Sequence, residues 1–267
     1  MPQSIASLGR SARRRLATLI EPSPIPNASE IAAYYPQQAS CQIPQFFFLL
    51  EHFLGASNEG HYVEVGAYDG LFASNTWGLA QRGWSGLLIE PVPELAESCR
   101  RNYARFPGVQ VVQSAVGREQ GTLTLHLAKQ LTTANPDTHE EYATVDWARS
   151  SLTSKQATVE VKTLDEILIS HAVPVGFDVL VVDVEGFESA VFDGFELSHW
   201  MPRMIVVELA DTHPDLKSTA PEDAALSALI SHAGYVIVFK DHINTVFVRS
   251  DVHMAAYHGG GDATSSE

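Results

Sequence analysis

The sequence is poor in cysteine and lacks any long apolar run. Its 267 residues include two cysteines, Cys41 and Cys99, too few for a disulfide framework or a cysteine-based zinc site. The longest apolar run, residues 43–50, is interrupted by Pro44 and Gln45 and is shorter than the roughly 18 residues that cross a bilayer. The N-terminus also lacks the apolar core of a secretory signal. These absences predict a cytoplasmic protein without a transmembrane segment.

Basic residues are scarce as well. The chain holds 17 lysines and arginines against 32 acidic residues, a formal charge of −15, which argues against general affinity for nucleic acid. Four of the basic residues are arginines in the first twenty positions, so the remainder carries 13 minus 32, or −19. That basic start is typical of a transit peptide or of a basic helix or tail. The acidic body favours neutral or cationic partners.

Composition also suggests how the chain is divided. A polar stretch without clear periodicity interrupts the domain at 129–154, and its length is unusual for a connection. Apolar spacing within 29–58 indicates a helix, which would either pack on the sheet or form a lid over a cofactor pocket. We therefore expect three parts: a basic segment with a proline-rich linker (1–28), one main domain (29–250) that contains both stretches, and a flexible tail (251–267).

The order of predicted elements defines a fold class. From residue 61 onward strands alternate with helices, which is the pattern of a parallel sheet. The last two strands, 235–240 and 244–249, are separated by three residues and must pair antiparallel. A terminal hairpin of this kind is typical of the methyltransferase variant of the doubly wound fold. We predict an α/β, Rossmann-like methyltransferase fold: a seven-stranded, mainly parallel sheet with a C-terminal antiparallel hairpin and helices on both faces.

Polar residues follow the predicted strands, at the edge where ligands bind in open α/β sheets. The first strand and its loop carry the motif HYVEVGAYDG (61–70) and then SNT (74–76). Glu90 ends the second strand, where a carboxylate can accept both hydroxyls of a ribose. The candidates along this edge are Glu64, Gly66, Asp69, Ser74, Asn75, Glu90, Ser114, Ala115, Asp183, Glu185, Glu208 and Asp211.

The glycine turn indicates what kind of cofactor to expect. It lacks the G-x-G-x-x-G spacing of a dinucleotide site, and the two carboxylates beside it, Glu64 and Asp69, would repel a pyrophosphate. A ligand with a ribose, a positive centre and no phosphate fits better. S-adenosylmethionine has these features.

These motifs resemble those of the FkbM-type S-adenosylmethionine-dependent methyltransferases, many of which methylate sugar or polyketide hydroxyls. The resemblance covers about residues 60–210, and its most specific part is VDVEGFESAVFDG (182–194); Glu64 stands where the family often has Asp. The other matching motifs are VEVGAYDG with SNT, IEPVPE (89–94), SAVG (114–117) and TLDEIL (163–168). The resemblance implies cofactor contacts at Glu64, Gly66, Asp69, Asn75, Glu90, Ala115 and Asp183.

Methylation of a hydroxyl needs a base or a metal, because a protonated hydroxyl is a weak nucleophile. The candidates for this catalytic role are Asp183, Glu185, Glu188, Glu208 and His213. Asp183, Glu185 and Glu208 could together hold Mg²⁺, which prefers oxygen ligands. Glu188 has an alternative role in stabilising a helix N-terminus, and His213 could equally be an ordinary surface residue.

We therefore predict a cofactor-dependent enzyme that transfers methyl from S-adenosylmethionine to an oxygen of a sugar-like or other small acceptor. The insertion at 129–154, which contains Tyr142 and Trp147, is the candidate surface for acceptor recognition. The alternatives are a nucleotide-sugar oxidoreductase that uses NAD and a non-catalytic binding protein on the same fold. Homo-oligomer formation is left open.

Overall fold

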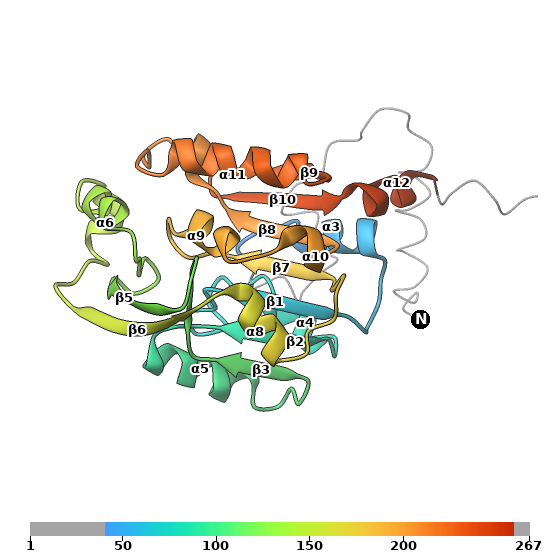
Figure 1. Cartoon of the computed structure of the whole chain (residues 1–267), viewed down its shortest axis with the longest axis horizontal. Coiled ribbons are helices and arrows are strands. Elements are labelled where there is room, and N and C mark those ends of the chain that lie inside the picture. Colours follow the sequence, from blue (N-terminus) through green and yellow to red (C-terminus); the bar gives the residue numbers. More distant parts are fainter. Residues whose placement is uncertain (1–40, 259–267) are drawn as a thin grey trace, which may run out of the picture.

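The computed structural model describes residues 41–258, and these form an α/β domain built around one large sheet (Figure 1). The strand order is β3-β2-β1-β7-β8-β10-β9. All neighbours pair in parallel except β10, which runs antiparallel to β8 and β9. The predicted fold is confirmed, including the C-terminal hairpin. The strands are β1 (His61–Val65), β2 (Ser85–Ile89), β3 (Val109–Val112), β7 (Val179–Val182), β8 (Met204–Glu208), β9 (Tyr235–Lys240) and β10 (Asn244–Arg249).

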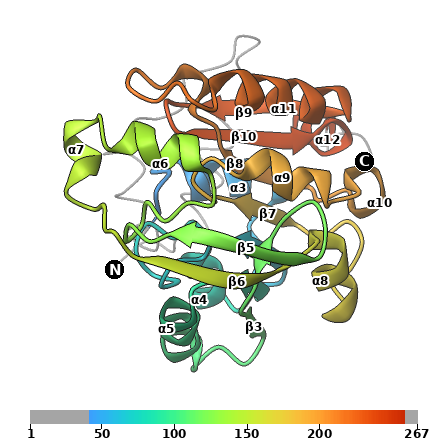
Figure 2. The ribbon, with the colours of Figure 1, turned by 60° about the vertical axis from the view of Figure 1, so that its left-hand side comes forward.

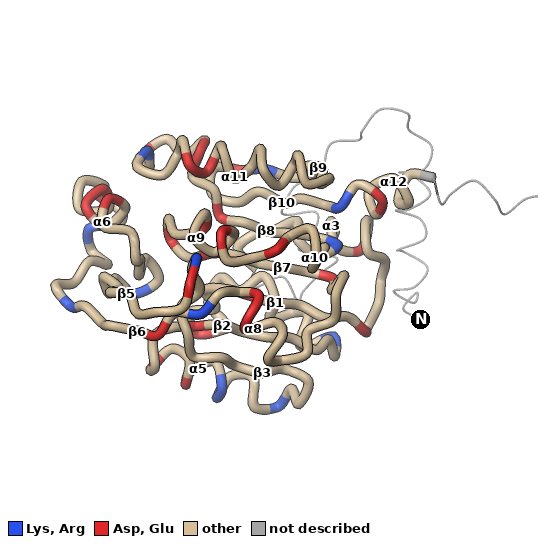
Figure 3. Tube along the Cα trace, in the orientation of Figure 1, with Lys and Arg blue, Asp and Glu red and all other residues tan. Residues whose placement is uncertain are grey.

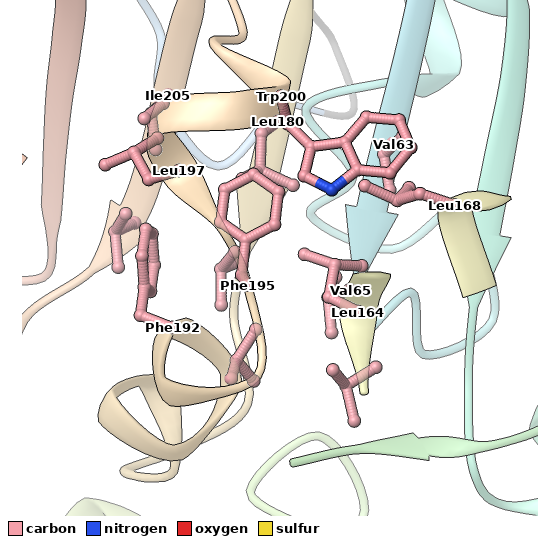
Figure 4. Packing of buried hydrophobic residues seen from close by; sticks show 14 of the residues in the cluster. Val63, Val65, Leu164, Leu168, Leu180, Phe192, Phe195, Leu197, Trp200 and Ile205 are labelled. Carbon is pink, nitrogen blue, oxygen red and sulfur yellow. The ribbon is translucent and has the colours of Figure 1, made fainter. Parts of the chain in front are cut away.

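Side chains that alternate along the strands build two cores, one on each face of the sheet. On β1, Val63 and Val65 belong to one core and Tyr62 to the other. The first core also contains Leu168, Phe195 and their neighbours, which pack against the same face of the sheet (Figure 4). Because the central strands are apolar on both faces, polar groups are confined to the strand ends.

Helices cover both cores, as predicted. Over the first core lie α8 (Leu164–Ser170), α9 (Glu188–Asp193), α10 (Leu197–Trp200) and α11 (Ala220–His232). Residues of α3 (Phe46–Leu54), α4 (Trp77–Gln81), α5 (Pro93–Tyr103) and α12 (Ser250–His258) pack in the second. The apolar stripe predicted within 29–58 forms α3, which ends at Gly55 with φ of +85° and packs on the sheet rather than forming a lid. Residues 1–28 lie outside the described part of the chain.

A second sheet of three strands stands beside the large one (Figure 2). The apolar run at 109–116 predicts one strand, but the strand is broken at residues 113 and 114. Its second piece, β4 (Ala115–Val116), pairs with β6 (Gln156–Lys162) instead. β6 pairs on its other side with β5 (Gly121–His126). This small sheet carries its own apolar cluster around Leu125 and Val161.

The polar insertion is folded. Residues 127–155, which connect β5 to β6 and are called the cap from here on, contain α6 (Pro136–Tyr142) and α7 (Asp146–Arg149). The Asn135 side chain accepts hydrogen bonds from the backbone N–H groups of Asp137 and Thr138 and so begins α6. The sequence shows no periodicity here because both helices are too short to reveal one.

Two expectations about helices need correction. The tail from residue 251 was expected to be flexible, but residues 250–258 form α12, which packs on α3 through Val252 and contacts such as His52 with Tyr257. The alternation of strands and helices also predicts a single helix at 186–197. The structure instead has α9 and α10, since the chain turns at Gly194, where a Cβ would stand 2.2 Å from the Gly117 carbonyl oxygen. Within the described residues, no helix is long and apolar enough to cross a membrane.

Candidate active site

The glycine turn after β1 lies against the loop after β7. Gly66 has φ of +86°, and a Cβ placed on it would stand 1.7 Å from the carbonyl oxygen of Asp183. The N–H groups of Gly66 and Ala67 both donate to the Ile89 carbonyl at the end of β2. This glycine is therefore required by the packing of the protein itself, and the turn joins the ends of three neighbouring strands.

Glu64, on β1, is a buried carboxylate held by hydroxyl groups. It is 5% exposed, and its Oε2 accepts a hydrogen bond of 2.7 Å from Thr76 Oγ1, while Ser74 Oγ lies 3.5 Å from both of its oxygens. The pKa of Glu64 is raised to about 8, mainly by burial. The hydrogen bond from Thr76 lowers this pKa, and the charge of nearby Asp183 raises it. A cationic group in this place would restore the ionised form of Glu64.

Glu90, directly after β2, is held by the backbone. Its Oε2 accepts from the Tyr68 N–H (2.9 Å) and its Oε1 from the Val92 N–H (2.8 Å). Burial raises the pKa of Glu90 to about 7 despite these two bonds. Each carboxylate oxygen has a further lone pair, so the group can still accept from ribose hydroxyls.

The polar residues of the loop after β1 have different roles. Ser74 Oγ accepts from the N–H groups of Thr76 and Trp77, and Asn75 Oδ1 accepts from the Ile43 N–H, so both are buried structural partners at the cavity wall. Asp69 is not part of that wall. Its Oδ1 accepts from the N–H groups of Leu71 and Phe72, which closes the turn, and the structure does not place it with the other candidates.

A single large cavity collects most of the predicted residues. Glu64, Gly66, Glu90 and Asp183 line it, and Ser114 and Ala115 form its wall near β4. Ser114 Oγ donates to its neighbour's carbonyl. Apolar side chains from α5 and the small sheet, Leu95 and Leu125 among them, continue that wall. The cavity thus runs from an acidic centre at β7 and β1 to an apolar end at β4.

Three acids meet at the other end of the cavity. Asp183, Glu185 and Glu208 each offer a carboxylate oxygen, and these atoms lie within 4.8 Å of one another. Burial, and then the charge of Asp183, hold the pKa of both Glu185 and Glu208 well above the usual range. Tyr142 Oη donates to Glu185 Oε2. The buried Glu208 Oε2 has no hydrogen-bond partner among the described residues.

Glu188 and His213 do not have the geometry of a base. Glu188 turns away from the large cavity, and its Oε1 accepts from the N–H groups of Val184 and Gly186. His213 lines the cavity, but its Nδ1 accepts from the N–H groups of Asp215 and Leu216, both at 3.0 Å. Burial lowers the pKa of His213. The neutral ring therefore carries its proton on Nε2, so it can donate a hydrogen bond and cannot take a proton there.

Several residues of the site were not singled out by the sequence. Thr76 holds Glu64, and Phe72 and Lys129 line the cavity mouth, where Phe72 is 61% exposed. Thr133, inside the cap, donates to the Glu185 carbonyl. Thr76 was within reach of sequence reasoning, since it belongs to the SNT motif. The pairing of Thr133 with Glu185 spans 52 positions and has no local signal.

The fold and this strand-end site define a methyltransferase-type doubly wound protein. The sequence profile described as the methyltransferase FkbM domain matches residues 64–237. The chain belongs to this family of S-adenosylmethionine-dependent methyltransferases, as its motifs predicted. Family membership and the antiparallel hairpin argue against the NAD-dependent alternative.

Individual relatives are distant. The chain is 28% identical over 165 residues to a protein named Methyltransferase 1 from Beauveria bassiana, over 58% of this chain and 64% of that protein's length. An O-methyltransferase from Bacillus cereus, solved with SAH, is similar at 14% identity and a TM-score of 0.44, covering 90% of this chain and 97% of its own. The SAH-bound methyltransferase PaMTH1 from Podospora anserina is similar at 10% identity and a TM-score of 0.43, covering 93% and 97%.

Proposed function

We propose that the protein transfers a methyl group from S-adenosylmethionine to a hydroxyl of a sugar or another small metabolite. The observation that carries the proposal is a set of three carboxylates, buried Glu64 and Glu90 and half-buried Asp183, on three neighbouring strand ends in one cavity. Glu90 suits the ribose, and the acids at β1 and β7 suit the amino group and the sulfonium. The apolar wall around Leu95 and Leu125 suits the adenine ring.

The acceptor would enter beside the acid cluster. Tyr142, Trp147 and His213 line that end of the cavity, with ring centroids of Trp147 6.2 Å from Tyr142 and 6.0 Å from His213. Such a wall can contact the apolar face of a sugar ring, while His213 Nε2–H donates to an oxygen. The role of 129–154 in acceptor recognition is part of this proposal.

Methyl transfer is an in-line displacement. The acceptor oxygen forms a bond to the methyl carbon, the carbon–sulfur bond breaks with its electron pair left on sulfur, and the acceptor proton leaves. Because His213 cannot take that proton, we assign it to a carboxylate of the cluster, Glu185 or Glu208. Alignment of the acceptor by the cavity would supply much of the rate.

The proposal includes a divalent cation such as Mg²⁺ at Asp183, Glu185 and Glu208. These residues fit the ion, since all three offer the oxygen ligands that Mg²⁺ prefers and Glu208 Oε2 is buried without a partner. When bound, the ion would polarise an acceptor hydroxyl. Isothermal titration with Mn²⁺ tests this, and binding that Glu208→Gln leaves unchanged would contradict it.

Calorimetric titration with S-adenosylhomocysteine tests the cofactor assignment, and a folded protein that does not bind it would refute the assignment. Incubation with S-adenosylmethionine and a panel of sugars, followed by mass spectrometry for a gain of one methyl group, tests the reaction and its acceptor. A gain on nitrogen-bearing acceptors alone would overturn O-methylation. Binding without transfer to any acceptor would favour the non-catalytic alternative. Cytoplasmic location and homo-oligomer formation stay predictions.

A further inference from the structure

The cap forms one wall of the cavity. Lys129, Gln130, Leu131 and Thr132 line it from the first part of the cap, and Tyr142 and Trp147 line it from α6 and the N-terminal half of α7. A ligand in the cavity therefore lies against the cap. The cap stands at the edge of the molecule, beyond the ends of the large sheet (Figures 1 and 2).

Among the described residues, two small apolar clusters attach the cap to the rest of the domain, separately from the two large cores. Leu127 and Ala134 pack against the cluster of the small sheet, and Tyr142 and Ala148 pack with Leu216. Most of the other attachments are hydrogen bonds. Glu141, for example, accepts from the Lys217 N–H (2.6 Å) and from Ser218 Oγ (2.7 Å). Segments held by few apolar contacts open at lower free energy than the core.

Three further hydrogen bonds from the cap converge on one turn, residues 185–186. Thr133 Oγ1 donates to the Glu185 carbonyl (2.6 Å), Asn135 Nδ2 donates to the Gly186 carbonyl (2.9 Å), and Tyr142 Oη donates to the Glu185 carboxylate. The fit is tight, because a Cβ on Gly186 would stand 2.4 Å from Thr138 Oγ1. Glu185 has φ of +57°, a conformation that costs a non-glycine residue free energy and that these bonds help to hold.

We propose that the cap is a gate over the cofactor, that the hydrogen bond from Tyr142 to Glu185 is its latch, and that Tyr142 is a positioning residue for Glu185. Opening the cap for cofactor exchange releases the Glu185 carboxylate, and closing the cap restores it to the cluster with Asp183 and Glu208. The acid cluster is then complete only while the cavity is covered. This inference rests on the proposed function for the identity of the cofactor.

The test measures how fast S-adenosylhomocysteine leaves the protein, by stopped-flow displacement. Losing this hydrogen bond removes one attachment of the cap, so Tyr142→Phe should speed dissociation about three- to tenfold. Glu185→Ala removes the other partner and should act in the same direction. If the two residues act through one bond, the double variant is no faster than the faster single variant.

Hydrogen exchange of the free protein supplies a second measurement that needs no ligand. Tyr142→Phe should speed amide exchange within residues 127–155 and leave the large sheet unchanged. Tyr235→Phe is the matched control, because it removes a buried tyrosine hydroxyl that donates to the Pro202 carbonyl outside the cap. It should change neither dissociation nor exchange in the cap.

The outcomes separate the two ideas. Additive effects in the double variant, or unchanged dissociation and cap exchange in Tyr142→Phe, would overturn the latch. If the wild-type protein does not bind S-adenosylhomocysteine but Tyr142→Phe still loosens the cap, the proposed function fails while the latch between Tyr142 and Glu185 stands.

Discussion

The two ends of the cavity are built in different ways. At the cofactor end, the partners of Glu64 and Glu90 are near in sequence, no more than 22 positions away. At the proposed acceptor end, Asp183, Glu185 and Glu208 crowd together. Glu185 accepts from Tyr142 of the cap, 43 positions away, and Glu208 Oε2 has no hydrogen-bond partner within residues 41–258. The carboxylates of the first end are thus held by local hydroxyl and backbone N–H groups, while those of the second depend on distant segments and lie against one another.

The most severe test of this comparison is Gly66→Ala, which separates the glycine turn from the loop after β7. The added methyl group would meet the Asp183 carbonyl at 1.7 Å, in a backbone with φ of +86°. We expect a loss of about 3 kcal/mol or more of unfolding free energy, measured by urea denaturation. The matched Gly121→Ala, which has open space around its Cβ, should change stability by far less. Equal effects would contradict the role given to Gly66.

A dependence on pH should follow from the buried acids. Glu64 and Glu90 have folded pKa values of about 8 and about 7, above the model-peptide value near 4.3. The folded state then holds more protons than the unfolded state between about pH 4.5 and pH 8. The contribution of these two acids to the free energy of unfolding is therefore complete below this window and is lost as the pH rises. We expect the melting temperature to fall by roughly 5 °C across it. Glu64→Gln should flatten that slope.

Glu90→Gln tests the cofactor end itself. The amide keeps the volume but loses the charge and one acceptor, so binding of S-adenosylhomocysteine should weaken about tenfold or more, while the fold survives. Titration calorimetry and circular dichroism measure the two effects. Unchanged affinity would remove the ribose assignment from Glu90.

Glu208→Gln should raise the stability of the protein, whereas Gly66→Ala lowers it. It removes one of three crowded carboxylates, so the protein without ligand should gain about 1 kcal/mol of unfolding free energy. Methyl transfer should fall at the same time. If the variant is instead destabilised, Glu208 makes favourable interactions in the free protein, and the contrast between the two ends is wrong.

The smallest effect is expected for Asp69→Asn. The side chain bonds the backbone of its own loop through Oδ1, which an amide oxygen can replace. Stability should change by less than about 0.5 kcal/mol and the affinity for S-adenosylhomocysteine by less than twofold. A large loss of affinity would restore Asp69 to the cofactor contacts that the family resemblance implied.

This contrast also explains what the sequence could predict. Apolar strands bounded by glycine and acidic residues are local signals, so the sheet, its hairpin and the cavity-lining positions of Glu64, Glu90 and Asp183 could be predicted. The gathering of Asp183, Glu185 and Glu208 could be predicted as well, since these acids follow neighbouring parallel strands whose ends meet.

What the sequence could not predict depends on hydrogen bonds to the backbone and on distant partners, neither of which residue type reveals. Asp69 has the residue type and position of a cofactor ligand, yet it is used by its own loop. The tautomer of His213 is set by backbone groups of Asp215 and Leu216. The folded conformation of the cap depends on contacts with residues 185–186 and 217–218. Acidic residues are gathered near these contacts, on α6 and at the start of α11 (Figure 3).

The close approach of Gly66 to Asp183 has a thermodynamic consequence. The two turns cannot shift independently, because their backbones are in direct contact. In the proposed function, one turn contacts the methyl donor and the other begins the acid cluster. A ligand that fixes the conformation of one turn therefore changes the free energy of ligand binding at the other. Such coupling is reciprocal: if the bound methyl donor changes the affinity for the acceptor by some factor, the bound acceptor changes the affinity for the donor by the same factor.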